Sequence, residues 1–362
     1  MLQIIISFIS SLLIVLIAIP SVIRVSYLKH LYDVPDERKS HESVIPTLGG
    51  LAIFAGFMIS SSLFMPTEDN VNYNFLVGAL MIVFFIGLKD DILITAPIKK
   101  LMGQLLAAVI LVVLGGVRIT SMYGFFGVAE LVPEISFLLT VFTIIVIMNG
   151  FNLIDGINCL SGGIGLVVSS VFGVWFVVNS FWSLGVISFS LSGSVLGFLW
   201  FNKTPAKIFM GDTGSLIIGL IIAYLAIYFI ELNPVAPNYS FNSIPVLTFG
   251  ILIVPLFDTL RVFVWRALKG KSPLTPDKNH IHHRLLELGW SHMRSSIVIV
   301  IFNISFVVLC FCLRNIGSIN LLIIEIMVAG SFSYIPSLIL RNKNEENTLK
   351  VIHSDSQKKK TA

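Results

Sequence analysis

Two adjacent aspartates, Asp90 and Asp91, are residues whose type and spacing could do chemistry. They follow an apolar stretch that ends in Gly87-Leu-Lys, so they lie at the polar end of a hydrophobic segment. Adjacent carboxylates repel one another and raise one pKa unless a cation lies between them. The pair favours divalent-metal binding or general-base work. The alternative is an N-cap for a segment that begins near Ile92, since Asp is a good cap.

Amide side chains and a carboxylate lie at the end of a second apolar segment. Asn152, Asp155 and Asn158 lie within one or two turns of each other in Asn149-Gly-Phe-Asn-Leu-Ile-Asp-Gly-Ile-Asn. Such groups suit a nucleobase, a ribose or a metal-bound water. The alternative is a helix C-cap followed by a turn, because Asp-Gly is a strong turn signal.

A third motif places Asp212 between glycines, in Gly211-Asp-Thr-Gly-Ser215, directly before a long apolar segment. Glycine permits close approach of the backbone to a ligand, and the following helix N-terminus offers free N–H groups to a phosphate. Asp212 is then a natural Mg²⁺ ligand. The same residues are also an ordinary capping sequence.

Imidazoles and a guanidinium gather in a fourth motif, which contains His280, His282, His283 and Arg284. A zinc site would need a further Cys or a nearby HxxxH partner to complete tetrahedral ligation. A pyrophosphate clamp fits better, because Arg binds phosphate bidentately. Three lysines add positive charge to this region: Lys269, Lys271 and Lys278. The alternative is a basic surface loop held against anionic lipid.

The segment before Gly49-Gly50 mixes acid, base and imidazole, and contains Asp33, Arg38 and His41. A further polar segment contains Lys100.

Two more pairs of polar residues lie at helical spacing. Gln104 follows Lys100 by one turn. Asp258 and Arg261 lie three residues apart, so they could simply neutralise each other on one helix face.

The composition shows what must position these motifs. Of the 362 residues, 56% are hydrophobic and only 12% are charged, whereas soluble domains carry roughly 25% charged residues. A soluble protein this apolar could not cover its surface with polar groups. The chain must therefore be solvated by lipid.

Eleven apolar stretches approach the roughly 20 residues that cross about 30 Å of hydrocarbon. They cover residues 3–23, 45–64, 72–88, 101–117, 135–149, 159–178, 182–201, 214–231, 244–265, 295–313 and 320–340. We predict an all-α polytopic membrane protein with about 11 transmembrane helices. One transmembrane domain covers residues 1–340, and residues 341–362 form a polar, disordered cytoplasmic tail.

Lysines and arginines predict the orientation. With eleven spans, all of them except Arg118 and Arg314 fall on one side, which the positive-inside rule makes cytoplasmic. The N-terminus is then outside, the C-terminus is cytoplasmic, and the motifs share the cytoplasmic face.

Together the motifs describe an electropositive, metal-ready cavity that lies level with the lipid surface. Carboxylates for Mg²⁺, basic groups for phosphates and small residues at helix starts are the parts of a phosphoryl-transfer site. A transporter or flippase of a nucleotide-sugar or lipid-linked anion is a rival, but transporters place polar residues near the midplane of broken helices. A non-catalytic scaffold is a third possibility.

The order and spacing of the motifs resemble the polyprenyl-phosphate N-acetylhexosamine-1-phosphate transferases. These are enzymes of the WecA and TagO type in glycosyltransferase family 4, and they are related to the phospho-MurNAc-pentapeptide translocase. The resemblance runs from Asp33 to about Arg294. It rests on Asp-x-Pro-x-x-Arg-Lys-x-His, Asp-Asp, Asn-x-x-Asp-Gly, Gly-Asp-x-Gly-Ser and His-x-His-His-Arg-Leu.

This resemblance implies a reaction at the inner leaflet of the bacterial cytoplasmic membrane. The phosphate of undecaprenyl phosphate attacks a UDP-N-acetylhexosamine (UDP-GlcNAc above all), UMP leaves, and the lipid product starts a cell-surface polysaccharide. The implied cofactor is Mg²⁺, with Mn²⁺ as a substitute. The implied partners are the two substrates, membrane lipid and a second copy of the chain, and not nucleic acid.

The resemblance also implies roles for the site residues. Asp90 or Asp91 prepares the lipid phosphate, and Asp212 with Asp91 holds Mg²⁺. Lys100 is a candidate for a phosphate contact. The other substrate-binding residues are Asn152, Asp155, Asn158, His280, His282, His283, Arg284, Arg38, His41 and Asp33.

Two features distinguish the chain within this family. Its His-Ile-His-His motif differs from the three adjacent histidines of the peptide-bearing branch, which indicates a free N-acetylhexosamine. Asn158-Cys159 stands where the family usually has Asp-Gly, so this loop can form hydrogen bonds but supplies one charge fewer for a metal.

Overall fold

A computed structural model of the chain describes residues 1–31, 45–66, 72–93, 95–270 and 280–360, with side chains described as far as residue 342. Several residues of the predicted motifs lie outside the described residues, including Asp33, Arg38, His41, Lys271 and Lys278.

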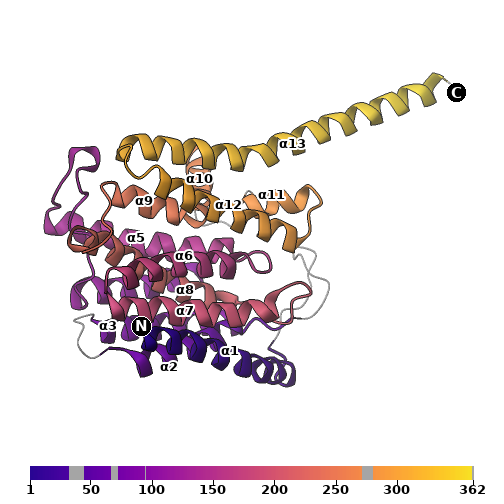
Figure 1. Ribbon diagram of the computed structural model, residues 1–362. Helices are drawn as coiled ribbons and strands as arrows, with labels where there is room; N and C mark the ends of the chain where they lie inside the picture. Colours follow the sequence, from indigo (N-terminus) through magenta and orange to yellow (C-terminus); the bar gives the residue numbers. More distant parts are fainter. Residues whose placement is uncertain (32–44, 67–71, 94, 271–279, 361–362) are drawn as a thin grey trace.

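The described chain is helical, apart from an isolated bridge between Ser121 and Glu130, which confirms the all-α class. Figure 1 shows the helices lying side by side in one bundle. They are α1 (Leu2–Leu28), α2 (Gly49–Phe64), α3 (Tyr73–Ile92), α4 (Pro97–Val109) with η1 (Ile110–Leu114), η2 (Phe125–Gly127), α5 (Pro133–Ile154), α6 (Leu160–Val178), α7 (Trp182–Asn202), α8 (Gly211–Leu232) with η3 (Asn233–Val235), α9 (Ile244–Ile251), α10 (Ile253–Leu268), α11 (Ile281–Glu287), α12 (His292–Cys312) and α13 (Ser318–Lys360).

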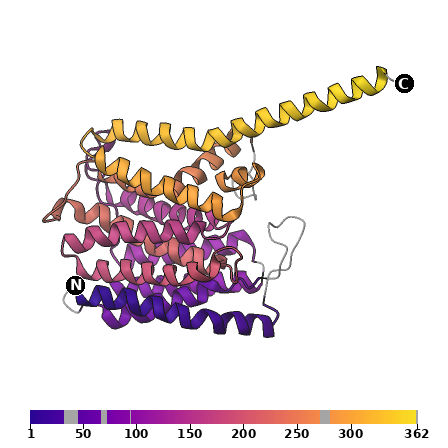
Figure 2. The same cartoon turned by 45° about the vertical axis from the view of Figure 1, so that its right-hand side comes forward.

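The apolar helices confirm a multi-pass membrane protein. Among the described residues, eight helices are long and apolar enough to cross a membrane, or nine if α9 and α10 count as one bent span. α2 is a shorter apolar helix of 16 residues. The count of eleven and the orientation therefore stay predictions. Figure 2 shows α13 extending past the bundle, and the disorder predicted for residues 341–362 also stays a prediction.

The apolar stretch predicted for residues 244–265 is not one continuous helix, because α9 and α10 meet at an angle of 88°. Pro255 lies at the third position of α10. It has no N–H for the carbonyl of Ile251, and its ring clashes with that carbonyl in a continuous helix. The side-chain amide of Asn303 instead donates to the Ile251 carbonyl at 3.4 Å.

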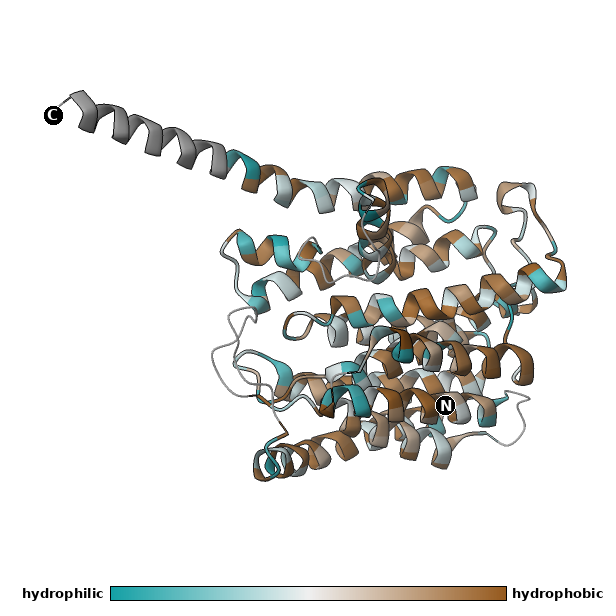
Figure 3. Ribbon diagram, turned by 180° about the vertical axis from the view of Figure 1, so that it is seen from behind, coloured by the Kyte–Doolittle hydropathy of each residue, from teal (hydrophilic) through white to brown (hydrophobic). Residues whose placement is uncertain are grey.

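α8 lies at the centre of the bundle and contacts α2, α3, α5, α6, α7 and α9. Its side chains from Thr213 to Ile227 are buried on every side, as expected for a helix that is hydrophobic all round. Figure 3 shows hydrophobic residues along the helices and many hydrophilic ones toward the end of the bundle at the left. The first turn of α8 lies at this polar end.

Small residues let α2 and α3 approach the start of α8. A Cβ on Gly50 would lie 2.2 Å from the backbone nitrogen of Gly214, and one on Gly87 would lie 2.5 Å from the Cα of Thr213. Backbone bonds from Gly49 to Phe209 (2.9 Å) and from Gly50 to Met210 (2.8 Å) join the same segments. The Gly49-Gly50 motif therefore packs helices together.

We expect Gly87→Ala to lower the free energy of unfolding by about 1–3 kcal/mol, because its methyl group would overlap backbone atoms of Thr213. The control is Gly78→Ala on the same helix, where a Cβ meets nothing within 4 Å. Thermal unfolding in detergent measures the difference. Equal midpoints for the two variants would contradict the close packing.

Candidate active site

Asp91 accepts hydrogen bonds from the first turn of α8. Its two oxygens accept from the backbone N–H of Asp212 at 2.6 Å and from that of Thr213 at 3.1 Å. The Thr213 hydroxyl donates to it at 2.5 Å. Asp91 therefore satisfies N–H groups that a helix start leaves without intrahelical partners, and its charge lies where the helix dipole favours an anion. It caps a helix, but not the segment near Ile92.

Asp90 has other hydrogen-bond partners than Asp91. The backbone N–H of Thr95 donates to it at 2.8 Å, the Thr95 hydroxyl also donates, and the Lys100 ammonium lies 3.3 Å from its Oδ2. Two neighbouring carboxylates thus avoid mutual repulsion, because one is paired with the start of α8 and the other with the start of α4.

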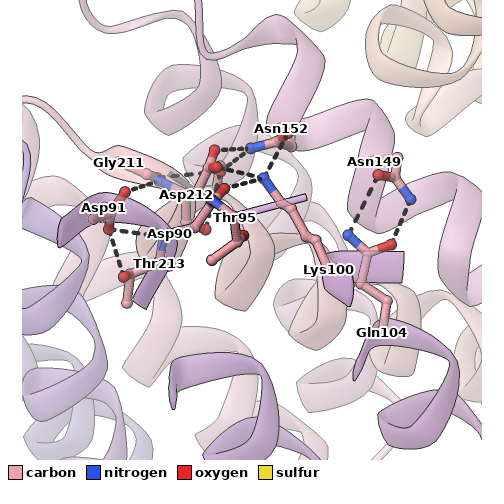
Figure 4. Close-up of polar contacts among 11 residues, drawn as sticks. Asp90, Asp91, Thr95, Lys100, Gln104, Asn149, Asn152, Gly211, Asp212 and Thr213 are labelled. Atoms are coloured by element: carbon pink, nitrogen blue, oxygen red, sulfur yellow. Dashed lines mark hydrogen bonds and ion pairs between the residues drawn. The ribbon is translucent and has the colours of Figure 1, made fainter. Parts of the chain in front are cut away.

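Lys100 joins three helices in one polar cluster. Its ammonium contacts the carboxylates of Asp90 and Asp212 and lies 3.4 Å from the Oδ1 of Asn152. Figure 4 shows these side chains converging from α3, α4, α5 and α8. The predicted phosphate contact thus lies at the centre of the predicted acidic residues.

Asn152 holds Asp212 from the other side. Its amide donates to Asp212 and, at 2.9 Å, to the hydroxyl of Ser215. Asn149, one turn before Asn152 on α5, and Gln104, one turn after Lys100 on α4, exchange two amide hydrogen bonds, of 2.8 and 3.3 Å (Figure 4). This pair ties α4 to α5, so that Lys100 and Asn152 reach the same carboxylate.

Asp155 follows the end of α5. Desolvation by burial raises its pKa well above the usual value, and the charges of Asp212 and Asp91 raise it further. Asp155 therefore belongs to the same electrostatic environment as the acidic cluster.

The histidine motif forms a second group. His282 is 1% exposed, and neither ring nitrogen has a hydrogen-bond partner in the described structure. A Cβ on Gly156 would lie 2.4 Å from its Nε2, so the ring packs against the turn that follows Asp155. Burial lowers the pKa of His282 to about 3, and the neighbouring His283 contributes to the shift.

His280 makes a contact that the sequence did not predict. Its Nδ1 lies 2.8 Å from the Oδ2 of Asp258. The structural pair of Asp258 with Arg261 is also present, at 2.8 Å. Asp258 and His280 lie 22 residues apart, and no local pattern connects them.

Two other predicted residues turn to partners outside the acidic cluster. Asn158 donates to the hydroxyl of Thr204 at 3.0 Å, and Arg284 pairs with Glu287 at 3.2 Å. His283 packs against His282, with ring centroids 4.2 Å apart.

The acidic cluster fits a magnesium ion that substrate phosphates help to hold. No group of three His, Cys, Asp or Glu within the described residues is arranged to hold a metal unaided. However, Asp90 and Asp212 already share one cation, the Lys100 ammonium. Mg²⁺ typically takes one or two carboxylates and completes its octahedron with water and phosphate oxygens. Asp91 fits less well, because both its oxygens accept bonds from α8.

The chain is similar to known bacterial proteins over most of its length. The sequence model described as "Glycosyl transferase family 4" matches residues 73–230. A relative from Bacillus subtilis (strain 168), named "Probable undecaprenyl-phosphate N-acetylglucosaminyl 1-phosphate transferase", is 36% identical over 85% of this chain and 86% of its own. The "Decaprenyl-phosphate N-acetylglucosaminephosphotransferase" of Mycolicibacterium smegmatis is 35% identical over 73% of this chain and 71% of its own. The "Undecaprenyl-phosphate alpha-N-acetylglucosaminyl 1-phosphate transferase" of Salmonella typhi is 30% identical over 75% and 73%.

The burial of His282 predicts a pH dependence of stability. Its pKa is about 3 in the folded chain and about 6.5 in an unfolded one. Between these values the unfolded state binds the extra proton, so the free energy of unfolding falls as the pH falls. The loss is up to about 1.4 kcal/mol per pH unit.

We therefore expect His282→Gln to flatten the fall of the thermal midpoint between pH 6.5 and 4.5. His30→Gln, which removes an exposed imidazole at the end of α1, should keep the wild-type slope. Identical slopes for all three proteins would contradict the burial of a neutral His282.

Proposed function

The chain belongs to glycosyl transferase family 4, and from this premise we propose that it transfers N-acetylglucosamine 1-phosphate from UDP-GlcNAc to undecaprenyl phosphate. The relatives are named for N-acetylglucosamine 1-phosphate transfer to undecaprenyl or decaprenyl phosphate. These names support a transferase and give no support to the transporter alternative. The product would start a lipid-linked cell-surface polysaccharide.

The proposed step is one displacement at phosphorus. An oxygen of the lipid phosphate bonds to the phosphorus that carries the sugar, and the bond from that phosphorus to the oxygen shared with UMP breaks. UMP leaves with this oxygen, and the lipid carries a diphosphate-linked sugar. No redox partner is needed.

The observation that supports this proposal is the convergence of Asp90, Lys100 and Asn152 on Asp212 at the start of α8. Phosphoryl transfer depends mainly on positioning and on electrostatic stabilisation of the phosphoryl oxygens. In this proposal, Lys100 contacts phosphate oxygens and Asn152 orients Asp212. Asp90 faces the lipid phosphate, because Asp91 is engaged with the backbone of α8.

Asp212 and Asp90 would hold Mg²⁺, or Mn²⁺ in its place. When bound, the ion neutralises charge on the phosphates and orients them. The bonds that Asp91 makes to Asp212 and Thr213 support a positioning role for Asp91 over direct ligation.

The remaining contacts to the UDP-sugar would come from residues outside the acidic cluster. Asp155 and Asn158 would contribute to the nucleotide site, and the histidine motif with Arg284 would lie around the diphosphate. The site would open toward the cytoplasm, with the protein in the bacterial inner membrane as a homodimer.

The direct test combines purified protein in detergent with undecaprenyl phosphate, Mg²⁺ and a panel of UDP-N-acetylhexosamines. We expect UMP release with UDP-GlcNAc, a matching lipid-diphosphate product and loss of both on addition of EDTA. Folded protein that releases no UMP with any donor would contradict the transferase. Release that persists in EDTA would contradict the metal.

We expect Asp212→Asn to lower kcat by about 10²–10³, the usual effect of losing one electrostatic stabiliser. The matched control is Glu231→Gln near the other end of α8, where the carboxylate accepts hydrogen bonds from Thr120. It should stay close to wild type. Near-normal turnover by Asp212→Asn would remove Asp212 from the mechanism.

A further inference from the structure

Asp258 is a buried carboxylate that connects α10 to the histidine motif. Its residue is 3% exposed. One oxygen, Oδ1, accepts from the Arg261 guanidinium at 2.8 Å and from the backbone N–H of Ile281 at 3.2 Å. The other oxygen, Oδ2, lies 2.8 Å from the Nδ1 of His280. The two oxygens therefore serve different partners.

The contact at Oδ2 requires a proton on the Nδ1 of His280. An ionised carboxylate can only accept hydrogen bonds, so Nδ1 is the donor. Nε2 is then the nitrogen left for another molecule. The His280 ring is also held against the His282 ring, with centroids 5.9 Å apart and planes at 10°.

The contact at Oδ1 fixes the chain that carries the ring, because Ile281 directly follows His280. α10 is itself seated on α5, where a Cβ on Gly150 would lie 3.0 Å from the carbonyl of Pro255. Two residues after His280, His282 packs against Gly156, beside Asp155. Asp258 thus holds the histidine motif next to the turn that follows α5.

We propose that Asp258 is a positioning residue for donor binding, which holds His280 through Nδ1 so that Nε2 binds the diphosphate of the nucleotide sugar. This inference rests on the proposed function. The carboxylate also balances a protonated ring, so His280 can meet the diphosphate as a cation without leaving a buried charge unpaired. Pairing with Arg261 alone, the role that the sequence suggests, would leave His280 unaffected.

The variant Asp258→Asn separates the two roles. Its side-chain oxygen can still accept from Arg261 and Ile281, but its amide NH₂ cannot accept from Nδ1. The ring loses the balancing charge, and a charge-assisted contact to phosphate becomes a neutral one, which is about half as strong. We expect the KM for the UDP-sugar to rise about tenfold, a second-sphere effect, and the KM for undecaprenyl phosphate to change less than about twofold.

Two further variants complete the experiment. Arg261→Gln removes the guanidinium from Oδ1 but keeps the contact between Oδ2 and His280, so it should leave the donor KM within about threefold of wild type. In the background of His280→Ala, Asp258→Asn should have little additional effect, because residues that act as a unit are not additive. Thermal unfolding, measured in parallel, reports any loss of fold, which would affect both substrates.

The outcomes are distinct. A rise in the donor KM with Asp258→Asn that disappears in the His280→Ala background supports the inference. An equal rise with Arg261→Gln, equal effects on both substrates, or additivity with His280→Ala would overturn it and leave the proposed function standing. If the wild-type protein releases no UMP with any donor, the proposed function fails, and this inference fails with it.

Discussion

A buried helix must still satisfy the N–H groups of its first turn, and here a carboxylate from another helix does so for α8. Asp91 accepts both the Asp212 and the Thr213 backbone N–H. α8 contacts six other helices, so whatever fixes its start also fixes the centre of the bundle. The same bonds orient Asp212, whose carboxylate at the start of α8 contacts Lys100. One interaction therefore joins the packing of the fold to the geometry of the site.

That interaction needs backbones in close contact. Gly87 and Gly50 lie where a methyl group would overlap α8, and Gly211 has a φ of +72° beside the Asp91 carboxylate. A bulkier residue at any of these positions would separate α2 or α3 from α8. These glycines thus act first through packing, and the polar groups meet because the helices can approach.

Much of this arrangement could be predicted from the sequence, because hydrophobic stretches and motif spacing are local patterns. They indicated helices joined by polar turns, and they brought Asp90, Lys100, Asn152 and Asp212 to one site. The partner of Asp91 lies 121 residues away, and no periodicity reveals a contact of that kind. The same holds for Asp258 and His280. The bend between α9 and α10 could have been predicted, since Pro255 lies within the apolar stretch of residues 244–265.

The charges of the cluster explain why it needs the rest of the site. Asp90 and Asp212 oppose a single ammonium, that of Lys100, and the positive end of α8, equivalent to about half a charge, is already matched by Asp91. The cluster is therefore net negative, and it would repel the phosphates of a lipid and of a nucleotide sugar. In the proposed function, Asp90 and Asp212 would hold Mg²⁺, whose two positive charges would offset this excess. In the proposed function, the histidine motif and Arg284 would lie around the diphosphate, so the two groups of residues would contact different parts of the same anionic substrates.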